Sequence, residues 1–247
     1  MKKRIAFITD SHLYQQLIQS DSEEIVYGDV EGANLQHLDI ALEDAKSKQI
    51  STIVFGGDIG TKASHEVFFS TVKKYSNDFS MILGNHDNYN EVKRYYPQKS
   101  ATESTLDFSK EDLFYKYVFM DSSAGLVEEH QLQWLSQEIK TDKRMILFIH
   151  HPVLEIATKI EQIGAALQNR DELLAVLKTA TTPPVIFCGH YHMNDERIQD
   201  GIQQFCTIAT SYEIEKEKEV IKTRPLVFGY RVIELEDGEI RTWTQTF

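Results

Sequence analysis

Residues 81–88 read MILGNHDN, in which three apolar residues and a glycine are followed directly by an amide, an imidazole and a carboxylate. The apolar run has the character of a buried strand. Gly, Asn and Asp are also common turn residues, and the stretch taken alone favours an ordinary turn over a functional site. The other strands of the chain have to decide between the two.

Apolar runs of strand length alternate with helix-like stretches, a pattern typical of a sheet with crossover helices. Strands are predicted at 4–9, 52–57, 80–84, 115–121, 144–149 and 184–189, then at 205–210, 226–236 and 239–247, and helical periodicity covers 35–45, 132–139 and 173–177. The mixed-charge run 213–222 is interpreted as a solvated loop or helix face, and 20–34 as a solvated loop rather than a lid or partner site. Because no linker or repeat divides the chain, residues 1–247 are expected to form one domain.

The composition narrows the class of protein. With 41% hydrophobic residues among 247, the chain can bury the core of one α/β domain. Its formal charge of −12 argues against general nucleic-acid binding or an anionic-membrane surface. Cys188 and Cys206 match no zinc-binding or redox spacing and favour a reducing compartment. No apolar run is long enough for a membrane span or a signal-peptide core, so the predicted location is cytoplasmic.

Five of the predicted strands end in side chains that can bind a metal ion. They are Asp10 and His12, Asp58, Asn85 with His86 and Asp87, His150 with His151, and His190 with His192. Each could be an isolated turn or helix-cap residue. However, most of the nine histidines occupy these positions, and imidazole is costly to bury without a partner. Because sites in open α/β sheets form at the carboxyl ends of strands, a shared site is the favoured interpretation.

The donor inventory indicates the metal content. Two Asp, one Asn and four His are too many ligands for one tetrahedral zinc site and suit two ions with open positions. Carboxylate, amide oxygen and imidazole fit Mn, Fe or Zn better than Ca or Mg, and the absence of thiolates argues against structural zinc. The sequence therefore predicts two divalent or mixed-valence transition-metal ions, a centre suited to hydrolysis.

The same residues carry a resemblance to a known family. Asp10-x-His12, Gly57-Asp58, Gly84-Asn85-His86-Asp87, His150-x-Pro152 and Gly189-His190-x-His192 resemble, in order and spacing, the motifs of the calcineurin-like metallophosphoesterases. The resemblance implies a four-layer αββα sandwich with two mixed β-sheets. It also implies that Asp10, His12 and His192 hold one ion, that Asn85, His150 and His190 hold the second, and that Asp58 bridges both.

Two residues of the GNHD motif receive catalytic roles from this resemblance. His86 aligns with the family's non-ligand histidine, which contacts the phosphate and protonates the leaving oxygen, and Asp87 would orient the His86 ring. His151 is expected to have a structural role behind the ligands. His37, His65 and His130 lie on polar helix patterns and are expected to be exposed to solvent.

The chain looks most like the bacterial cyclic-nucleotide phosphodiesterase-like branch, on its size, its GNHD form and residues 119–139. This resemblance implies a small phosphate-ester substrate, a diester such as a cyclic nucleotide, hydrolysed by attack of a metal-bound hydroxide. A phosphomonoesterase acting on a small metabolite or nucleotide is the alternative. A non-catalytic scaffold of the same fold is less favoured, because His86 and all seven ligands are present. The oligomeric state stays open, with a homodimer among the alternatives.

Overall fold

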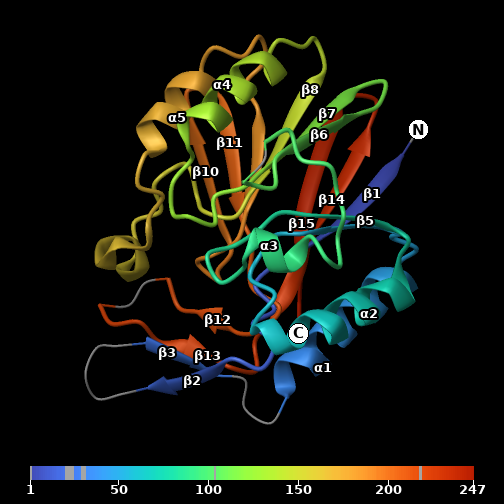
Figure 1. The fold of residues 1–247 in the computed structure, drawn as a ribbon, viewed down its shortest axis with the longest axis vertical. Helices are drawn as coiled ribbons and strands as arrows, with labels where there is room; N and C mark the ends of the chain where they lie inside the picture. The colour runs from blue at the N-terminus through green and yellow to red at the C-terminus, as the bar shows by residue number, and fades with distance from the viewer. Residues whose placement is uncertain (1, 20–24, 29–31, 103, 217–218) are drawn as a thin grey trace.

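Two large β-sheets lie face to face, with helices on both outer faces (Figure 1). The computed structural model describes the whole chain except residues 1, 20–24, 29–31, 103 and 217–218. Both large sheets contain parallel and antiparallel neighbours. The predicted four-layer αββα sandwich with two mixed sheets is therefore confirmed.

The first sheet has the strand order β15-β14-β1-β4-β5. Its strands are β1 (Lys3–Ile8), β4 (Thr52–Phe55), β5 (Asp78–Met81), β14 (Gly229–Glu236) and β15 (Glu239–Thr246). β1, β4 and β5 run parallel, and β14 pairs with the other side of β1 in the antiparallel direction. β1 lies at the centre, and its last four residues are all buried. Such a continuous apolar run is typical of a strand that is covered on both faces.

The second sheet has the strand order β10-β11-β9-β8-β7-β6. Its strands are β6 (Phe108–Glu111), β7 (Tyr115–Met120), β8 (Arg144–Ile149), β9 (Val185–Cys188), β10 (Asp195–Gln199) and β11 (Ile202–Cys206). The four inner strands are parallel, and β6 and β10 close the edges in the antiparallel direction. Both edge strands are polar and partly exposed, and the sequence analysis missed them because they lack the apolar character of the inner strands.

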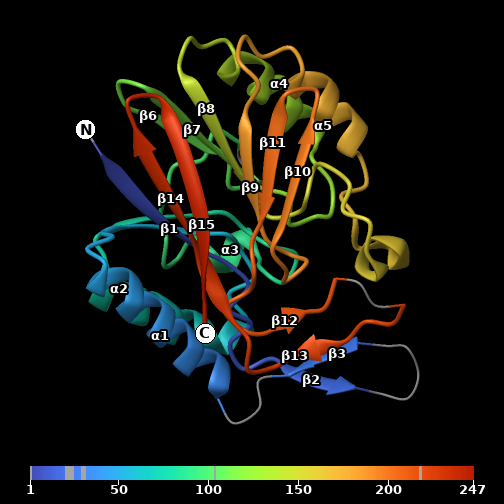
Figure 2. The ribbon, with the colours of Figure 1, turned by 180° about the vertical axis from the view of Figure 1, so that it is seen from behind.

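The longer helices divide between the two outer faces. The α-helices are α1 (Ala33–Ser47), α2 (His65–Tyr75), the single turn α3 (Tyr89–Val92), α4 (Glu129–Glu138) and α5 (Arg170–Leu177). In Figures 1 and 2, α1 and α2 cover the first sheet, and α4 and α5 cover the second. Between the sheets, the rings of Phe7 and Phe148 lie 5.6 Å apart and those of Phe148 and Phe187 5.8 Å apart. None of the described helices has the length and apolar character needed to cross a membrane.

Two short ribbons lie side by side at one end of the molecule (Figures 1 and 2). They are formed by β2 (Gln16–Gln19) with β3 (Ile25–Gly28), and by β12 (Glu213–Ile214) with β13 (Thr223–Arg224). The interpretation of 20–34 as a loop is wrong for β3, and its residues 20–24 and 29–31 lie outside the described residues. The run 213–222 likewise begins as a strand, and its residues 217–218 lie outside the described part.

Each strand predicted from the sequence is present among the described residues, with one clear displacement. The strand predicted at 205–210 ends at Cys206, because the chain then turns toward the end of β1. The N–H of Thr210 donates to the carbonyl of Thr9 at 2.9 Å, and the N–H of Ser211 donates to that of Asp10 at 3.2 Å. The turn after β11 is therefore attached to the first residues of the candidate site.

Two of the three histidines expected to be exposed are buried. His37 is 7% exposed, its ring stacks on Phe228 at 3.8 Å, and its Nδ1 bonds to the carbonyl of Ser211 at 2.9 Å. His65 begins α2 and is 2% exposed. Their prediction as exposed residues was wrong because the polar helix pattern does not reveal which loops cover a helix. The side chain of His130 is 40% exposed, as expected.

Candidate metal centre

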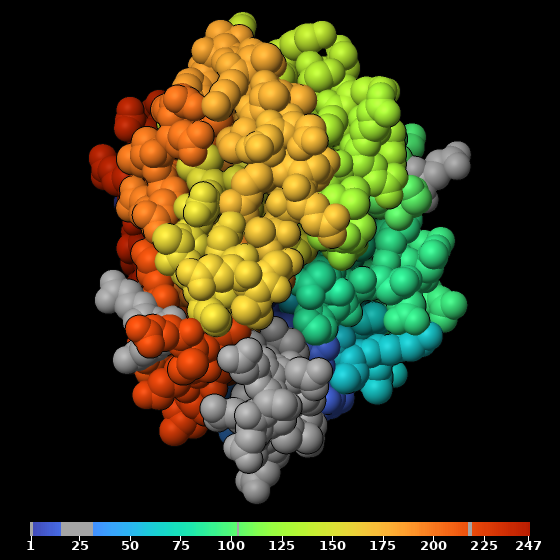
Figure 3. Space-filling view, turned by 90° about the vertical axis from the view of Figure 1, so that its left-hand side faces the viewer, coloured from blue at the N-terminus to red at the C-terminus, as the bar shows by residue number. Residues whose placement is uncertain are grey.

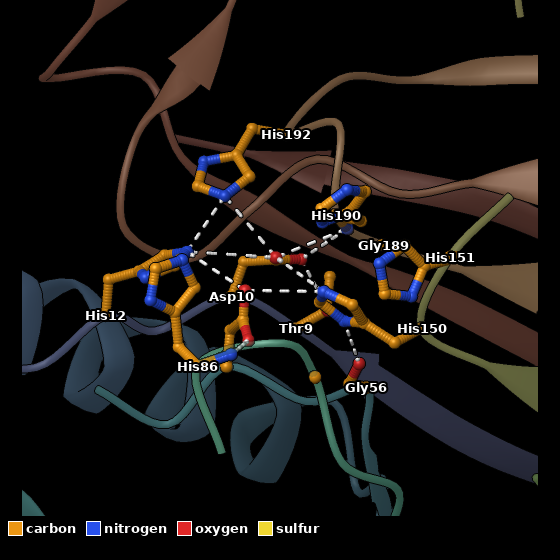
Figure 4. A network of polar contacts seen from close by, with 12 residues as sticks. Thr9, Asp10, His12, Gly56, His86, His150, His151, Gly189, His190 and His192 are labelled. Carbon is orange, nitrogen blue, oxygen red and sulfur yellow. Dashed lines mark hydrogen bonds and ion pairs between the residues drawn. The ribbon is translucent and has the colours of Figure 1, made fainter. Parts of the chain in front are cut away.

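The predicted site residues converge where strands of both sheets end. Figure 4 shows the side chains of Asp10, His12, His150 and His192 directed toward one another, with His86 and His190 beside them. Beyond the last paired residues of β1 and β4, the N–H of Asp10 donates to the carbonyl of Gly57 at 2.9 Å. The two loops that carry candidate ligands from the first sheet therefore run together past the strands.

The backbone at the candidate ligands is unusual. Five of them have positive φ angles between 42° and 68°, namely Asp10, His12, Asp58, His190 and His192. This left-handed conformation is uncommon for residues other than glycine, and it redirects a side chain sharply at the end of a strand. Its concentration here indicates a functional site, because such strain persists only where the surrounding structure enforces it.

Asp10, His12 and His192 form one group of possible ligands, whose ligand atoms all lie within 4.8 Å of one another. Oδ1 of Asp10 lies 3.3 Å from Nε2 of His192, and Nε2 of His192 lies 3.0 Å from Nε2 of His12. Metal–nitrogen bonds of about 2.0–2.1 Å place neighbouring ligand nitrogens at about this separation. The spacing therefore fits two imidazoles that share one ion.

Asp58, His150 and His190 form a second group with the same close spacing. Oδ2 of Asp58 lies 3.3 Å from Nε2 of His150 and 3.6 Å from Nε2 of His12. Asp58 thus faces members of both groups. The oxygen that faces both groups is Oδ2, which could serve two ions, while Oδ1 accepts the backbone N–H of His86 at 2.8 Å.

Backbone carbonyls fix the orientation of three imidazoles. Nδ1 of His150 lies 2.8 Å from the carbonyl oxygen of Gly56, and Nδ1 of His192 lies 3.1 Å from that of Tyr212. In His190 the roles of the nitrogens are reversed, because Nε2 lies 2.9 Å from the carbonyl oxygen of Ala165. A nitrogen that faces a carbonyl must carry the proton, so the other nitrogen keeps its lone pair for a metal.

His150 provides a direct test of whether a metal fits. Its Nε2 is buried and lies 3.3 Å from Oδ2 of Asp58 and 3.9 Å from Oδ1 of Asp10, without a well-formed hydrogen bond to any described residue. A buried nitrogen that faces two carboxylates in this way calls for an explanation. A cation between these groups would provide one, and the donor set of imidazoles and carboxylates is that of a transition-metal site.

The pKa values of the candidate ligands are shifted strongly from their ordinary values. Burial alone would lower the pKa of His150, but the carboxylates of Asp58 and Asp10 outweigh it and raise the pKa to about 10. Burial lowers the pKa of His12 to about 4, and burial together with the charge of His150 lowers that of His190 to about 3. Despite burial, neighbouring histidines hold the pKa values of Asp10 and Asp58 below their ordinary range. The carboxylates are therefore ionised, as metal ligands must be.

The GNHD turn contributes residues with different environments. The ring of His86 is partly exposed and packs edge-on against that of His12, with centroids 5.1 Å apart. Asn85 is exposed, and its side chain forms no hydrogen bond with another residue that the structure describes. His86 forms a third group of possible ligands with His12 and Asp58, whose ligand atoms also lie within 4.8 Å of one another. The turn thus places His86 at the partly exposed rim, close to members of both other groups.

Asp87 contacts backbone amides rather than the ring of His86. Its carboxylate accepts the N–H groups of Asp58 at 2.7 Å, Ile59 at 3.0 Å and Gly84 at 2.9 Å. No hydrogen bond joins it to the His86 imidazole in the described structure, so the expected orienting contact is not found. Burial, reinforced by the negative charge of Asp58, raises the pKa of Asp87 to about 7.

His151 lies behind the ligands, in agreement with the role expected for it. It is buried, its Nδ1 lies 2.9 Å from Oγ of Ser122, and its ring is centred 4.2 Å from that of His190. It belongs to none of the three groups of possible ligands found among the described residues. Packing against His190 is therefore its visible contribution to the site.

Sequence reasoning missed two groups that contact the imidazoles. Gln15 lies between His12 and His86, and the ring of Tyr212 is centred 4.5 Å from that of His192. Gln15 follows His12 by three residues, a spacing that could have drawn attention to it. The Tyr212 contact comes from the turn after β11, which the sequence analysis extended as strand.

The site lies close to the surface. Figure 3 shows the segment near residue 160, in yellow, next to the segment near residue 90, in blue-green, with blue N-terminal residues beneath them. His86 and His190 are both partly exposed. A small ligand from solvent could therefore reach these two rings without a rearrangement of the core.

Curated proteins with similar sequences have phosphodiesterase names. The "Probable cyclic nucleotide phosphodiesterase" of Fibrobacter succinogenes is 26% identical over 207 residues, which cover 82% of this chain and 81% of that protein. The "Probable glycerophosphodiester phosphodiesterase GpdQ" of Arcobacter nitrofigilis is 28% identical over 205 residues, which cover 78% of this chain and 73% of that protein. The resemblance to the bacterial phosphodiesterase-like branch is thereby confirmed.

A solved structure supports the fold independently. A dimetal phosphatase from Danio rerio matches with a TM-score of 0.66 at 14% identity, with 98% of each chain covered. The sequence model of the family described as "Calcineurin-like phosphoesterase" matches residues 3–194, a range that includes every candidate ligand. This match covers most of the chain and agrees with the two ligand groups at the strand ends, and the chain belongs to the calcineurin-like phosphoesterase family.

Proposed function

We propose that the chain is a phosphodiesterase that depends on two metal ions and hydrolyses small diesters such as cyclic nucleotides. The observation that carries this proposal is the pair of ligand groups that face the single carboxylate of Asp58. Family membership supports phosphate-ester hydrolysis as the reaction.

The proposed ligand sets follow the two groups. Asp10, His12 and His192 hold one ion, His150 and His190 with Asn85 hold the other, and Asp58 bridges them. Asn85 is included because the family resemblance assigns it as a ligand and because it directly precedes His86 in the GNHD motif. The donor set favours Mn, Fe or Zn. Two such ions, when bound, lower the pKa of water and neutralise charge on phosphate oxygens.

The protein residues then position the reacting groups. Asp58 is held at two points. Its backbone N–H donates to the carboxylate of Asp87, and its Oδ1 accepts the backbone N–H of His86 at 2.8 Å. His86 is the proposed proton donor to the leaving oxygen, since it is the partly exposed imidazole beside the ligands. Asp87 is proposed to act through Asp58 and the turn rather than through the His86 ring.

The charges of the site favour a diester. A diester carries one negative charge, whereas a monoester approaches two at neutral pH. Among the described residues, no lysine or arginine forms an ion pair with Asp10 or Asp58, and the side chains that contact these carboxylates are histidines, the proposed metal ligands. The two relatives described above both have names that refer to phosphodiesters.

The test is a comparison of substrates with protein of known metal content. Purified protein is stripped with a chelator, reloaded separately with Mn, Fe or Zn, and assayed with cyclic nucleotides, bis(p-nitrophenyl) phosphate and p-nitrophenyl phosphate. We expect activity only after reloading, and cleavage of the bis-ester at least as fast as that of the monoester. A strong preference for the monoester would indicate a phosphomonoesterase, and two bound ions without turnover of any ester would indicate a scaffold.

A further inference from the structure

The side chain of Gln15 joins two imidazoles that have different proposed tasks. Its Oε1 contacts Nδ1 of His12, and its Nε2 lies 3.3 Å from Nδ1 of His86. The two rings lie edge to face, with centroids 5.1 Å apart and planes at 80°. One amide therefore contacts both a candidate metal ligand and the candidate proton donor.

The orientation of the Gln15 amide follows from the chemistry of His12. Nε2 of His12 lies 3.0 Å from Nε2 of His192 and 3.6 Å from Oδ2 of Asp58, so this nitrogen faces the ligand group. A ligand nitrogen must keep its lone pair, so the proton of His12 has to be on Nδ1. Nδ1–H then donates to a hydrogen-bond acceptor, and the only acceptor atom of the Gln15 amide is its oxygen.

This orientation determines the protonation of His86. With its oxygen on His12, Gln15 presents its NH₂ group to Nδ1 of His86. A neutral imidazole has one donor and one acceptor nitrogen, so Nδ1 accepts and the proton is on Nε2. The reversed amide would place its NH₂ group against Nδ1–H of His12, where two donors meet.

Asp87 cannot fix the tautomer of His86 in this way. Its two oxygens accept three backbone N–H groups and form no hydrogen bond with the His86 ring in the described structure. We propose that Gln15 is the positioning residue of His86: metal binding by His12 sets the amide orientation, and the amide keeps Nδ1 of His86 as an acceptor, so that Nε2–H donates a hydrogen bond to the leaving oxygen as charge develops on it. The contact stands on geometry alone. The tautomer rests on the proposed role of His12 as a metal ligand, and the consequence for catalysis rests on the proposed function.

The first experiment measures the tautomer and needs no substrate. The zinc-loaded protein is labelled with ¹⁵N-histidine, and the His86 signals are assigned by comparison with His86→Ala. We expect Nδ1 of His86 to resonate as an unprotonated nitrogen. In Gln15→Glu, whose carboxylate can only accept, the proton should shift onto Nδ1 while His12 keeps its acceptor. A proton on Nδ1 in the unchanged protein, or no difference in Gln15→Glu, would overturn the proposal.

The second experiment measures turnover at saturating metal. Gln15→Met keeps the length of the side chain but removes the amide, and it should slow cleavage of a diester with a poor alkyl leaving group by about 10- to 100-fold. The loss should be much smaller with p-nitrophenolate, which departs with little need for a proton. The matched control is Gln137→Met, an exposed residue of α4, which should change neither rate. Equal losses with both leaving groups, or recovery when more metal is added, would contradict a role through His86.

A double-mutant comparison separates this role from a merely structural one. If Gln15 acts through His86, Gln15→Met should cost nothing further once His86 is already alanine. If Gln15→Met lowers the turnover rate by the same factor in the unchanged protein and in His86→Ala, Gln15 supports the site in another way and the proposal fails. Should no ester be cleaved at all, the proposed function fails, and the tautomer measurement still decides whether Gln15 sets the proton of His86.

Discussion

The carboxylate of Asp87 accepts the backbone N–H of Asp58 at 2.7 Å, so the last residue of the GNHD motif holds the residue that faces both ligand groups. The same carboxylate accepts the N–H groups of Ile59 and Gly84. The side chain of Asp87 thus attaches the motif to the backbone that follows β4. The conformations of the motif and of Asp58 therefore depend on each other.

Replacing Asp87 with Ala should weaken metal binding as well as folding. Three backbone N–H groups lose their acceptor, and each one left unsatisfied costs about 1–3 kcal/mol. We expect a lower melting temperature and fewer bound ions, measured by thermal unfolding and elemental analysis. Asp112→Ala is the control, since Asp112 also accepts backbone N–H groups, from Phe114 and Tyr115, at another place in the fold. Full metal content with turnover lost only for poor leaving groups would instead point to the His86 ring.

Metal binding should release protons and become tighter as the pH rises. Because Asp58 and Asp10 raise the pKa of His150 to about 10, this imidazole is protonated at neutral pH and a cation must displace the proton. This competition weakens as the pH rises toward that pKa, so affinity should increase. Because the pKa values of His12 and His190 are low, these rings are already neutral at pH 7, and metal binding displaces no proton from them. Calorimetry in buffers of different ionisation enthalpy measures the release, and a value of zero would refute the assignment of His150.

His86→Ala should slow turnover without removing metal. A positioned acid or base contributes roughly 10²–10⁴-fold to the rate, and that loss is expected for an alkyl leaving group. With p-nitrophenolate the loss should shrink, because this oxygen needs little protonation. Elemental analysis of the variant provides the control for metal content. If ions are lost, or if both substrates are slowed equally, His86 is a ligand or a phosphate contact rather than a proton donor.

Gly84→Ala should disturb the site through steric overlap alone. A Cβ atom at this position would overlap the carboxylate and backbone N of Asp58, and the φ angle of Gly84 is not in the left-handed region. We expect loss of bound metal, measured by elemental analysis. Gly238→Ala is the comparison, because it strains the β14–β15 turn, where φ is +90°, but a Cβ there meets no atom within 4 Å. Equal metal loss in both variants would mean that general destabilisation is responsible.

The apolar runs were sufficient to predict the inner strands because these strands are buried on both faces, whereas the two-sheet sandwich was implied by the family resemblance. β1 and β8 are continuous apolar runs, and such runs can be recognised without any partner. The edge strands β6 and β10 are polar, and their pairing depends on neighbours that the local sequence does not reveal. The burial of His37 could not be predicted for a similar reason, since it depends on the distant Phe228.

The candidate site was predictable as a set of residues but not as a set of contacts. Asp10, Asp58, His150 and His190 follow apolar runs, so the rule of strand ends is enough to bring them together. The ring nitrogens that these histidines do not turn toward the site bond to backbone groups. His150 bonds to the carbonyl of Gly56, and His190 bonds to that of Ala165. Backbone groups are the same at every position in a sequence, so the role of Asp87 as an acceptor of amides was missed.

The pairing of β1 with β14 has a consequence for biosynthesis. Lys3 lies opposite Leu235, so β1 has to wait for a partner strand that is synthesised much later. Until then one edge of β1 offers unpaired backbone groups to other nascent chains, and contacts of such long range form slowly. We therefore expect the polypeptide to depend on chaperones or slow translation to avoid aggregation. The turn from Cys206 to Ser211, which is attached to Asp10, also emerges long after β1, so the ligand groups should become ordered only once this turn has been synthesised.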